Sequence, residues 1–263
     1  MFNYRFPFIY SLLLLLFAGP LFLLILQSFS IEWNWGSIYP QKFGVSGWKT
    51  ALSDPALQHS FLLTFLLTLI VVVLNLLIAL PAAKALASCE FKGKTIIDTL
   101  FFLPILIPVT AISMGLHLSM IRMGLADTWY GVTLVHLIPT LPYTIRVLRS
   151  GFERIGVRTE EQGRTLGGGA LQNFWYLQWP RLLPSLRAAI FLTVVISVSQ
   201  YVLTVIIGGG AVPALALIYF PYTSSANASA VSAFSLLFAL LPALLMLTLE
   251  ILLRGSKPKM NRA

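Results

Sequence analysis

The chain has 263 residues, of which 57% are hydrophobic and only 10% are charged, and its formal net charge is +9. An ordinary soluble domain carries about 25% charged residues, so this composition excludes a soluble globular protein and indicates a lipid bilayer as the solvent. No dense run of basic residues interleaved with aromatic ones occurs, so the positive charge does not indicate binding to nucleic acid.

Six apolar stretches reach the length of about 20 residues that a helix needs to cross a bilayer. In chain order they are 8–29, 61–86, 96–118, 129–148, 186–207 and 229–253. The first stretch runs beyond the usual core of a cleaved signal peptide, so we expect a helix there and not a leader. Long apolar runs without period-two alternation favour helices over barrel strands, because lipid offers no partner to a free backbone amide. The sequence predicts an all-α, polytopic membrane protein with six transmembrane helices, forming one domain over 1–263 with a core at about 58–253.

The basic residues are distributed unequally between the two sets of connections. One set, which includes both ends of the chain, carries 15 Lys and Arg residues, and the other carries three. Since cytoplasmic connections are enriched in Lys and Arg, this asymmetry predicts that both termini are cytoplasmic.

Residues that could carry catalysis or hold a metal are sparse. Cys89 is alone, and the three histidines show no metal-ligand spacing. Gly93 to Thr95 resembles the end of a phosphate-binding loop, but no strand precedes it as that motif requires. We therefore expect no catalytic residue, metal site or cofactor in this chain.

The segment 159–184 interrupts the apolar pattern. Thr159 and Gln162 have the spacing of a capping box, which predicts the start of a helix. Three glycines beginning at Gly167 would end that helix and reverse the chain. A second helix is expected to begin near Ala170 and to stop at Pro180. The pattern predicts two short helices joined by a glycine elbow on the cytoplasmic side.

The second of these helices would present Leu171, Phe174 and Trp175 on one side. An apolar ridge in water is unfavourable unless it packs on the membrane helices or on a partner. Two interpretations are therefore open: an interfacial helix pair that serves only the bundle, or a docking element for a soluble subunit.

The same segment resembles the EAA loop of ATP-binding-cassette (ABC) importer permeases, whose pattern is E-A-A, three residues, G, nine residues and I-x-L-P. Here Glu161-Gln162-Gly163, Gly167 and Leu177-Gln178-Trp179-Pro180 fill the pattern without a gap. The two alanines are replaced, and Gly163 weakens the helix by about 1 kcal/mol relative to alanine. The position of the loop between the fourth and fifth spans, and the runs LPILIP and PYTIRVLRSGFE, extend the likeness to most of the chain. It is similar to type I (MetI-like) importer permeases of the polyamine, thiamine and iron group.

This resemblance implies a permease subunit of the bacterial inner membrane that forms half of a translocation pathway and is surrounded by lipid. Its implied partners are a cytoplasmic ABC ATPase dimer that uses ATP and Mg²⁺, an extracytoplasmic substrate-binding protein, and a second permease subunit, a paralogue in preference to a second copy. The implied substrate is a small polar or cationic solute. The residues expected to couple to the ATPase are Glu160, Glu161, Gly163, Arg164, Gly167, Phe174, Trp175 and Pro180.

Polar residues recur at helical spacing within the predicted spans and could line a path. The candidates are Asn75, Ser113, His117, His136, Ser197, Gln200 and Tyr201. Ordinary hydrogen bonding between helices is the alternative reading for each of them. Gln200 with Tyr201 is the preferred passage site, because an amide and a phenol offer both donors and acceptors.

An ion-coupled secondary transporter or a channel subunit is the rival function. Such carriers use carboxylates in the middle of a span. Here Asp98 lies near the end of the third stretch, and Glu250 is expected to pair with Arg254 one turn later. The absence of a mid-span carboxylate therefore argues against an ion-coupled carrier.

Overall fold

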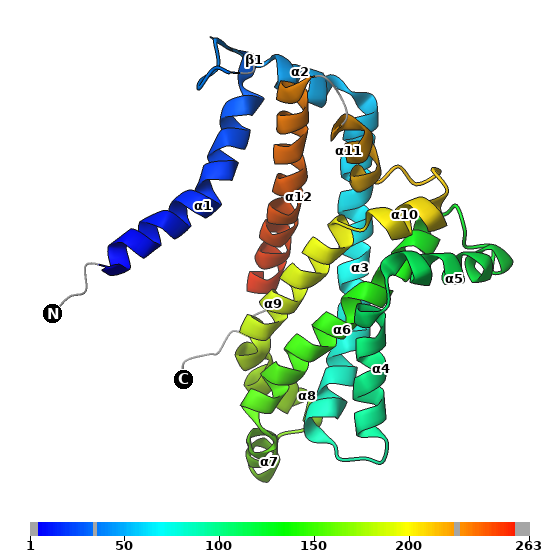
Figure 1. Ribbon diagram of the computed structural model, residues 1–263. Coiled ribbons are helices and arrows are strands. Elements are labelled where there is room, and N and C mark those ends of the chain that lie inside the picture. The colour runs from blue at the N-terminus through cyan, green and yellow to red at the C-terminus, as the bar shows by residue number, and fades with distance from the viewer. Residues whose placement is uncertain (1–4, 34–35, 224–226, 256–263) are drawn as a thin grey trace.

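The computed structural model describes residues 5–33, 36–223 and 227–255, and it is a bundle of helices (Figure 1). The helices are α1 (Arg5–Ser28), α2 (Ser46–Ser53), α3 (Pro55–Ser88), α4 (Lys94–Leu106), α5 (Val109–Arg122), α6 (Trp129–Ile155), α7 (Val157–Thr165), α8 (Ala170–Gln172), the π-helix η1 (Asn173–Gln178), α9 (Trp179–Val198), α10 (Tyr201–Gly208), α11 (Leu215–Thr223) and α12 (Ala228–Gly255). Two short antiparallel strands, β1 (Ser30–Glu32) and β2 (Lys42–Phe43), lie between α1 and α2. The predicted all-α fold is confirmed.

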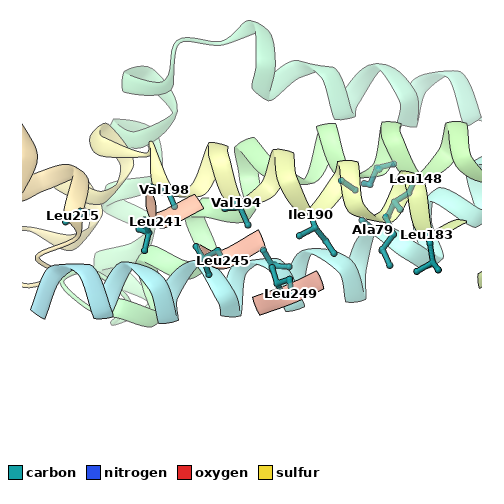
Figure 2. Close-up of a cluster of buried hydrophobic side chains, with 14 of the residues drawn as sticks. Ala79, Leu148, Leu183, Ile190, Val194, Val198, Leu215, Leu241, Leu245 and Leu249 are labelled. Atoms are coloured by element: carbon teal, nitrogen blue, oxygen red, sulfur yellow. The ribbon is translucent and has the colours of Figure 1, made fainter. Parts of the chain in front are cut away.

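The core lies where α3, α6, α9 and α12 meet. Figure 2 shows Ala79 of α3, Leu148 of α6, Ile190 of α9 and Leu245 of α12 converging there, all of them buried. Among the described residues, the helices long and apolar enough to cross a membrane are Pro55–Ser88, Trp129–Ile155, Ala170–Val198 and Ala228–Leu253.

α1 leans away from these helices over its first half and approaches α12 near its end (Figure 1). Leu14, Leu15 and Phe17 of α1 are each at least 71% exposed. An apolar helix surface of this kind suits contact with lipid.

Two of the six predicted spans are interrupted, which corrects the expectation of uninterrupted helices. The stretch 96–118 is divided at Pro108, whose ring disfavours the helical conformation for the preceding residue, and Ile107 is extended at φ −86° and ψ 134°. The stretch 186–207 is divided at Gln200, which has ψ 84°. Just before it, the Ser199 hydroxyl donates to the Ile196 carbonyl at 3.0 Å, a local bond that competes with the helical ladder.

Beyond these breaks, α5 and α10 pack against each other and lie across the long helices (Figure 1). Their 14 and 8 residues correspond to lengths of about 21 and 12 Å, less than the roughly 30 Å of a hydrocarbon core. Each of these two stretches therefore enters the bundle as one helix and continues as a second in a different direction.

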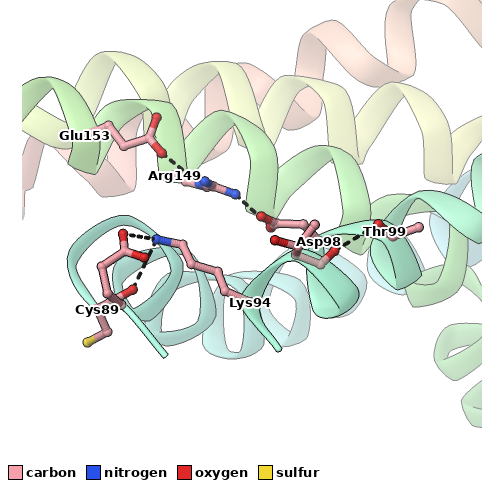
Figure 3. Close-up of polar contacts among 8 residues, drawn as sticks. Cys89, Lys94, Asp98, Thr99, Arg149 and Glu153 are labelled. Atoms are coloured by element: carbon pink, nitrogen blue, oxygen red, sulfur yellow. Dashed lines mark hydrogen bonds and ion pairs between the residues drawn. The ribbon is translucent and has the colours of Figure 1, made fainter. Parts of the chain in front are cut away.

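The two ends of the bundle carry different elements, which we call the α7 end and the α11 end. At the α7 end, Arg149 of α6 donates to Asp98 of α4 and to Glu153, each at 2.7 Å (Figure 3). Between α9 and α12, Arg187 donates to both carboxylate oxygens of Glu250 at 2.8 Å. Asp98 and Glu250 are therefore paired across helices, while the side chain of Arg254, the expected partner of Glu250, lies outside the described residues.

Candidate functional sites

The segment 159–184, which we call the EAA-like segment, begins inside α7. Gly156, at φ 75° and ψ 149°, separates α6 from α7, so the helix starts at Val157. Thr159 therefore lies within the helix, where its hydroxyl donates to the Ile155 carbonyl at 2.8 Å. The predicted capping box at Thr159 is wrong, because the conformation of Gly156 moves the helix start before it.

The glycine elbow after α7 has the predicted form. Gly167 has φ +83°, the left-handed conformation that glycine adopts without strain. Its amide donates to the Arg164 carbonyl at 2.9 Å, and the Gly168 amide donates to the Gly163 carbonyl at 2.9 Å. These bonds satisfy two carbonyls that the end of α7 leaves open.

The second helix of the segment does not stop at Pro180, contrary to prediction. α8 passes into η1 and then into α9 without leaving the helical conformation. Pro180 lies in the first turn of α9, directly after the wide π-helical turn, where its missing amide and its ring are accommodated. The EAA-like segment is therefore continuous with a membrane-length helix.

The apolar ridge of the segment is divided between the bundle and the surface. Phe174 packs against the core beside Trp179, with ring centroids 5.9 Å apart. In contrast, Leu166, Leu171 and Trp175 are 88%, 72% and 40% exposed. The bundle covers one side of the ridge, and the second side is available to a partner.

Adjacent acidic residues in α7 occupy different environments. The Glu160 carboxylate accepts hydrogen bonds from Gln178 and Arg164 at 2.8 Å each and lies 3.2 Å from Lys84 Nζ of α3. Although burial acts to raise the pKa of Glu160, these three partners together hold its pKa below the ordinary value. Glu161 is exposed. Glu160 is thus an internal anchor of α7, and Glu161 is a surface residue.

A hollow of about 470 Å³ opens between the end of α3 and α7. Its polar lining includes Lys84, Cys89, Glu160, Glu161 and Arg164. The hollow lies between the backbones of α3 and α7, and the contact between the Lys84 and Glu160 side chains connects the two helices beside it.

A second cavity, of about 250 Å³, lies at the two helix breaks. Its lining consists of Pro104, Val109, Ile112, Ile138 and Pro139 together with residues 199–203. Gln200 and Tyr201 both belong to this lining, and the Tyr201 ring stacks on Phe220 of α11 at 5.0 Å. These two residues are the predicted passage site, whereas the first turn of α5 lies beside them only because the stretch 96–118 is broken at Pro108.

His136 and Ser197 meet inside the bundle and not at this cavity. His136 Nδ1 lies 3.0 Å from Ser197 Oγ, and His136 Nε2 lies 3.0 Å from Thr204 Oγ1. Thr68 of α3 is 3.4 Å from the same Ser197 oxygen. All four side chains are buried, so this network ties α3, α6, α9 and α10 together by hydrogen bonds.

The other predicted path residues belong neither to the lining of the cavity at the helix breaks nor to the His136 network. Asn75 is fully buried in α3 with no hydrogen-bond partner for either amide atom in the described structure. The Ser113 hydroxyl donates to the Val109 carbonyl at 2.6 Å, and His117 is half-buried further along α5. The seven candidates therefore do not converge on one surface of the isolated chain. In the described part of the chain, no three His, Cys, Asp or Glu residues are grouped so that they could hold a metal ion.

Comparison with known proteins is consistent with this arrangement. The chain is 28% identical over 178 residues to the sulfate transport system permease protein CysW of Synechococcus elongatus, an alignment that covers 63% of this chain and 62% of that protein. It is 27% identical over 167 residues to the molybdenum transport system permease protein ModB of Escherichia coli, covering 59% of this chain and 72% of ModB.

A solved bacterial ABC transporter involved in the import of the acidic polysaccharide alginate contains a chain with a similar fold. The TM-score is 0.72, with 19% identity, and the match covers 94% of this chain and 95% of that one. The family model for the inner membrane component of binding-protein-dependent transport systems matches residues 78–262, more than half of the chain and all of the EAA-like segment. The chain therefore belongs to the family of binding-protein-dependent transport system inner membrane components.

Proposed function

We propose that this chain is a permease subunit of an ABC importer and forms half of a translocation pathway, with no catalytic residue of its own. ATP hydrolysis, with Mg²⁺, would belong to a separate ATPase dimer. The observation that carries the proposal is the EAA-like segment: a partly uncovered apolar ridge that continues without interruption into α9. A motion imposed on Leu171 and Trp175 by a bound partner would be transmitted directly to a membrane helix.

The remaining partners follow from the family. A substrate-binding protein would deliver the solute at the α11 end, and a second permease subunit, a paralogue in preference to a second copy, would complete the pathway. The excess of Lys and Arg in the connections at the α7 end favours a cytoplasmic position for that end and for both termini, in the inner membrane.

The proposed substrate is a small oxyanion of the sulfate or molybdate class. The named relatives are sulfate and molybdenum permeases. An oxyanion therefore replaces the polyamine-, thiamine- or iron-like solute that the sequence resemblance implied. The cavity supports this choice, because the first turns of α5 and α10, at Val109 and Tyr201, both line it. Helix N-termini carry a partial positive charge, which favours an anion, although the Tyr201 amide itself already donates to the Ser199 carbonyl at 2.9 Å. No charged side chain is among the lining residues, so an anion would be held weakly enough to pass.

The test is reconstitution of the chain with its cognate ATPase, second permease and binding protein in proteoliposomes. Uptake of labelled sulfate or molybdate should require ATP, the ATPase and the binding protein together. Uptake without the ATPase, driven by a proton or sodium gradient, would instead identify the rival secondary transporter. A chain that neither retains the ATPase nor transports would leave the EAA-like segment as an interfacial helix pair of the bundle, and the proposal would be wrong.

A further inference from the structure

α3 and α7 are joined by side chains more than by packing. Their backbones hardly touch across the hollow that separates them, whereas Lys84 Nζ lies 3.2 Å from Glu160 Oε2. Gln178, at the end of η1, donates to the same carboxylate oxygen at 2.8 Å. A movement of α7 would therefore reach α3 through Glu160. The same carboxylate also contacts the end of η1, which continues directly into α9.

The opposite end of α3 is tied to α11. The Leu215 amide, at the start of α11, donates to Thr64 Oγ1 at 2.7 Å in a buried contact. Near the end of α11, the Tyr222 hydroxyl donates to the carboxylate of Asp54, which also caps α3 by accepting from the Ala56 amide at 2.9 Å. Both ends of α11 are thus bound at the start of α3, one to the residue that caps the helix and the other to its third turn.

Between these ends, α3 is continuous. Its 34 residues correspond to a length of about 50 Å, and its one internal proline, Pro81, lies in the last third, close to Lys84. The helix packs along α6 and α9. It is therefore suited to transmit a displacement from one end of the bundle to the other.

α11 in turn touches the cavity at the helix breaks. Phe220 of α11 stacks on Tyr201 with ring centroids 5.0 Å apart and an interplanar angle of 26°. Tyr201 lines that cavity at the first turn of α10. An unbroken series of contacts leads from Glu160 through Lys84, α3 and α11 to the cavity.

We propose that α3 is a mechanical link between the EAA-like segment and the cavity, with Lys84 as the positioning residue at one end and Tyr222 at the other. This inference rests on the proposed function and names the route by which closure of an ATPase would reach the cavity. Loss of the Lys84–Glu160 contact should separate ATP hydrolysis from movement of α11, while Glu161 and the exposed ridge continue to hold the ATPase.

The experiment uses the full complex in proteoliposomes, in a Cys89→Ser background with a fluorophore on Thr223→Cys, an exposed position at the end of α11. The fluorescence change on trapping with ATP and vanadate is measured together with sulfate uptake per ATP hydrolysed. Lys84→Met should retain the ATPase but reduce both quantities by about fivefold. Lys84→Arg should preserve them, because arginine can also donate to Glu160.

Lys94→Met is the matched control. It removes the same charge from the same end of the bundle, where Lys94 lies (Figure 3). Lys94 pairs with the exposed Glu90 at 2.8 Å. It should behave as wild type. At the other end of α3, Tyr222→Phe should leave hydrolysis intact and lower uptake per ATP.

The proposed link would be wrong if Lys84→Met and Tyr222→Phe both showed the same fluorescence change and the same sulfate uptake per ATP as the wild type. If Lys84→Met lost the ATPase altogether, Tyr222→Phe would decide, since Tyr222 lies at the opposite end of α3 from Lys84 and the EAA-like segment. Failure of the wild-type chain to retain the ATPase would contradict the proposed function itself and is a separate result.

Discussion

Gly163 of α7 lies directly against the side-chain amide of Asn173 in η1, with no room between them for a Cβ atom. A Cβ on Gly163 would also come within 2.8 Å of Leu177 Cδ1. The Asn173 side chain is buried, and its Nδ2 donates to the Gly168 carbonyl at 3.2 Å. The departure from alanine in the EAA pattern therefore has a local cause: Asn173 occupies the place of the methyl group and holds the glycine elbow.

Gly163→Ala should destabilise the protein by about 1–3 kcal/mol through overpacking, outweighing the roughly 1 kcal/mol that alanine adds to helix propensity. Thermal unfolding of the purified chain in detergent measures the effect. In an Asn173→Ala background the closest obstruction is removed and only the end of the flexible Leu177 side chain remains, so the same Gly163→Ala change should cost less. Equal costs in the two backgrounds would contradict the contact.

Gly167→Pro should abolish retention of the ATPase while leaving the chain inserted in the membrane. Proline requires φ near −65°, whereas Gly167 has φ +83°, and its amide donates to the Arg164 carbonyl. Gly167→Asn is the control, because asparagine tolerates the left-handed conformation and keeps the amide. Co-purification of the ATPase is the measurement, and full retention by Gly167→Pro would show that the elbow is not needed for docking.

Gln200→Leu should lower sulfate or molybdate uptake by about 2- to 10-fold, the value of one lost hydrogen bond, without affecting assembly. The substitution removes an amide from the cavity lining at a similar side-chain volume. Val202→Leu changes the apolar lining of the same cavity and should have a smaller effect. Uptake by Gln200→Leu at the wild-type rate would remove this residue from the passage site.

The Tyr222–Asp54 contact should stabilise the chain over a wide pH range. The hydrogen bond to Asp54, with burial, raises the pKa of Tyr222 to about 12, and the same bond lowers the pKa of Asp54. A raised tyrosine pKa stabilises the fold below the unfolded value of about 10 and ceases to do so as the pH rises toward the folded value. The lowered Asp54 pKa adds stability that is lost only below about pH 4.

The melting temperature of wild type should therefore exceed that of Tyr222→Phe by a constant margin from pH 5 to pH 9. The margin should shrink above about pH 10, where an unfolded tyrosine ionises. Melting curves at pH 7 and near pH 11 provide the measurement. A margin that widens at high pH would have the wrong sign for this contact.

The orientation of the chain can be tested with one native and one introduced cysteine. Ile38, at the α11 end, is 92% exposed, and Cys89, at the α7 end, is also exposed. In intact cells a membrane-impermeant maleimide should label Ile38→Cys in a Cys89→Ser background, and should label Cys89 of the wild type only after permeabilisation. Labelling of Cys89 from outside would reverse the proposed topology.

Several features of the fold were predictable from local sequence. Both ends of α12 lie within two residues of the apolar run at 229–253, and α6 begins at Trp129 as predicted but continues to Ile155, beyond the expected end at 148. Gly167 ends α7 as the three glycines indicated. The breaks were not predicted, because the runs at 96–118 and 186–207 stay apolar across Pro108 and Gln200. Pro108 is a weak signal for the first break, because Pro104 lies inside α4 without interrupting it, and the second break has only the serine before Gln200.

The sequence by itself determined the solvent, the class of fold and the place of the EAA-like segment. These depend on the length of apolar runs, which a bilayer sets through its thickness, and on glycine and proline, whose conformational limits act within one or two residues. Only the tertiary structure decided that Glu160 pairs with Lys84, that His136 bonds to Ser197 within the bundle, and that Gln200 faces a cavity beside α5. Each of these depends on how elements far apart in the chain pack against one another, which no local sequence signal specifies. For the buried His136–Ser197 contact, hydrocarbon offers the polar groups no other partner.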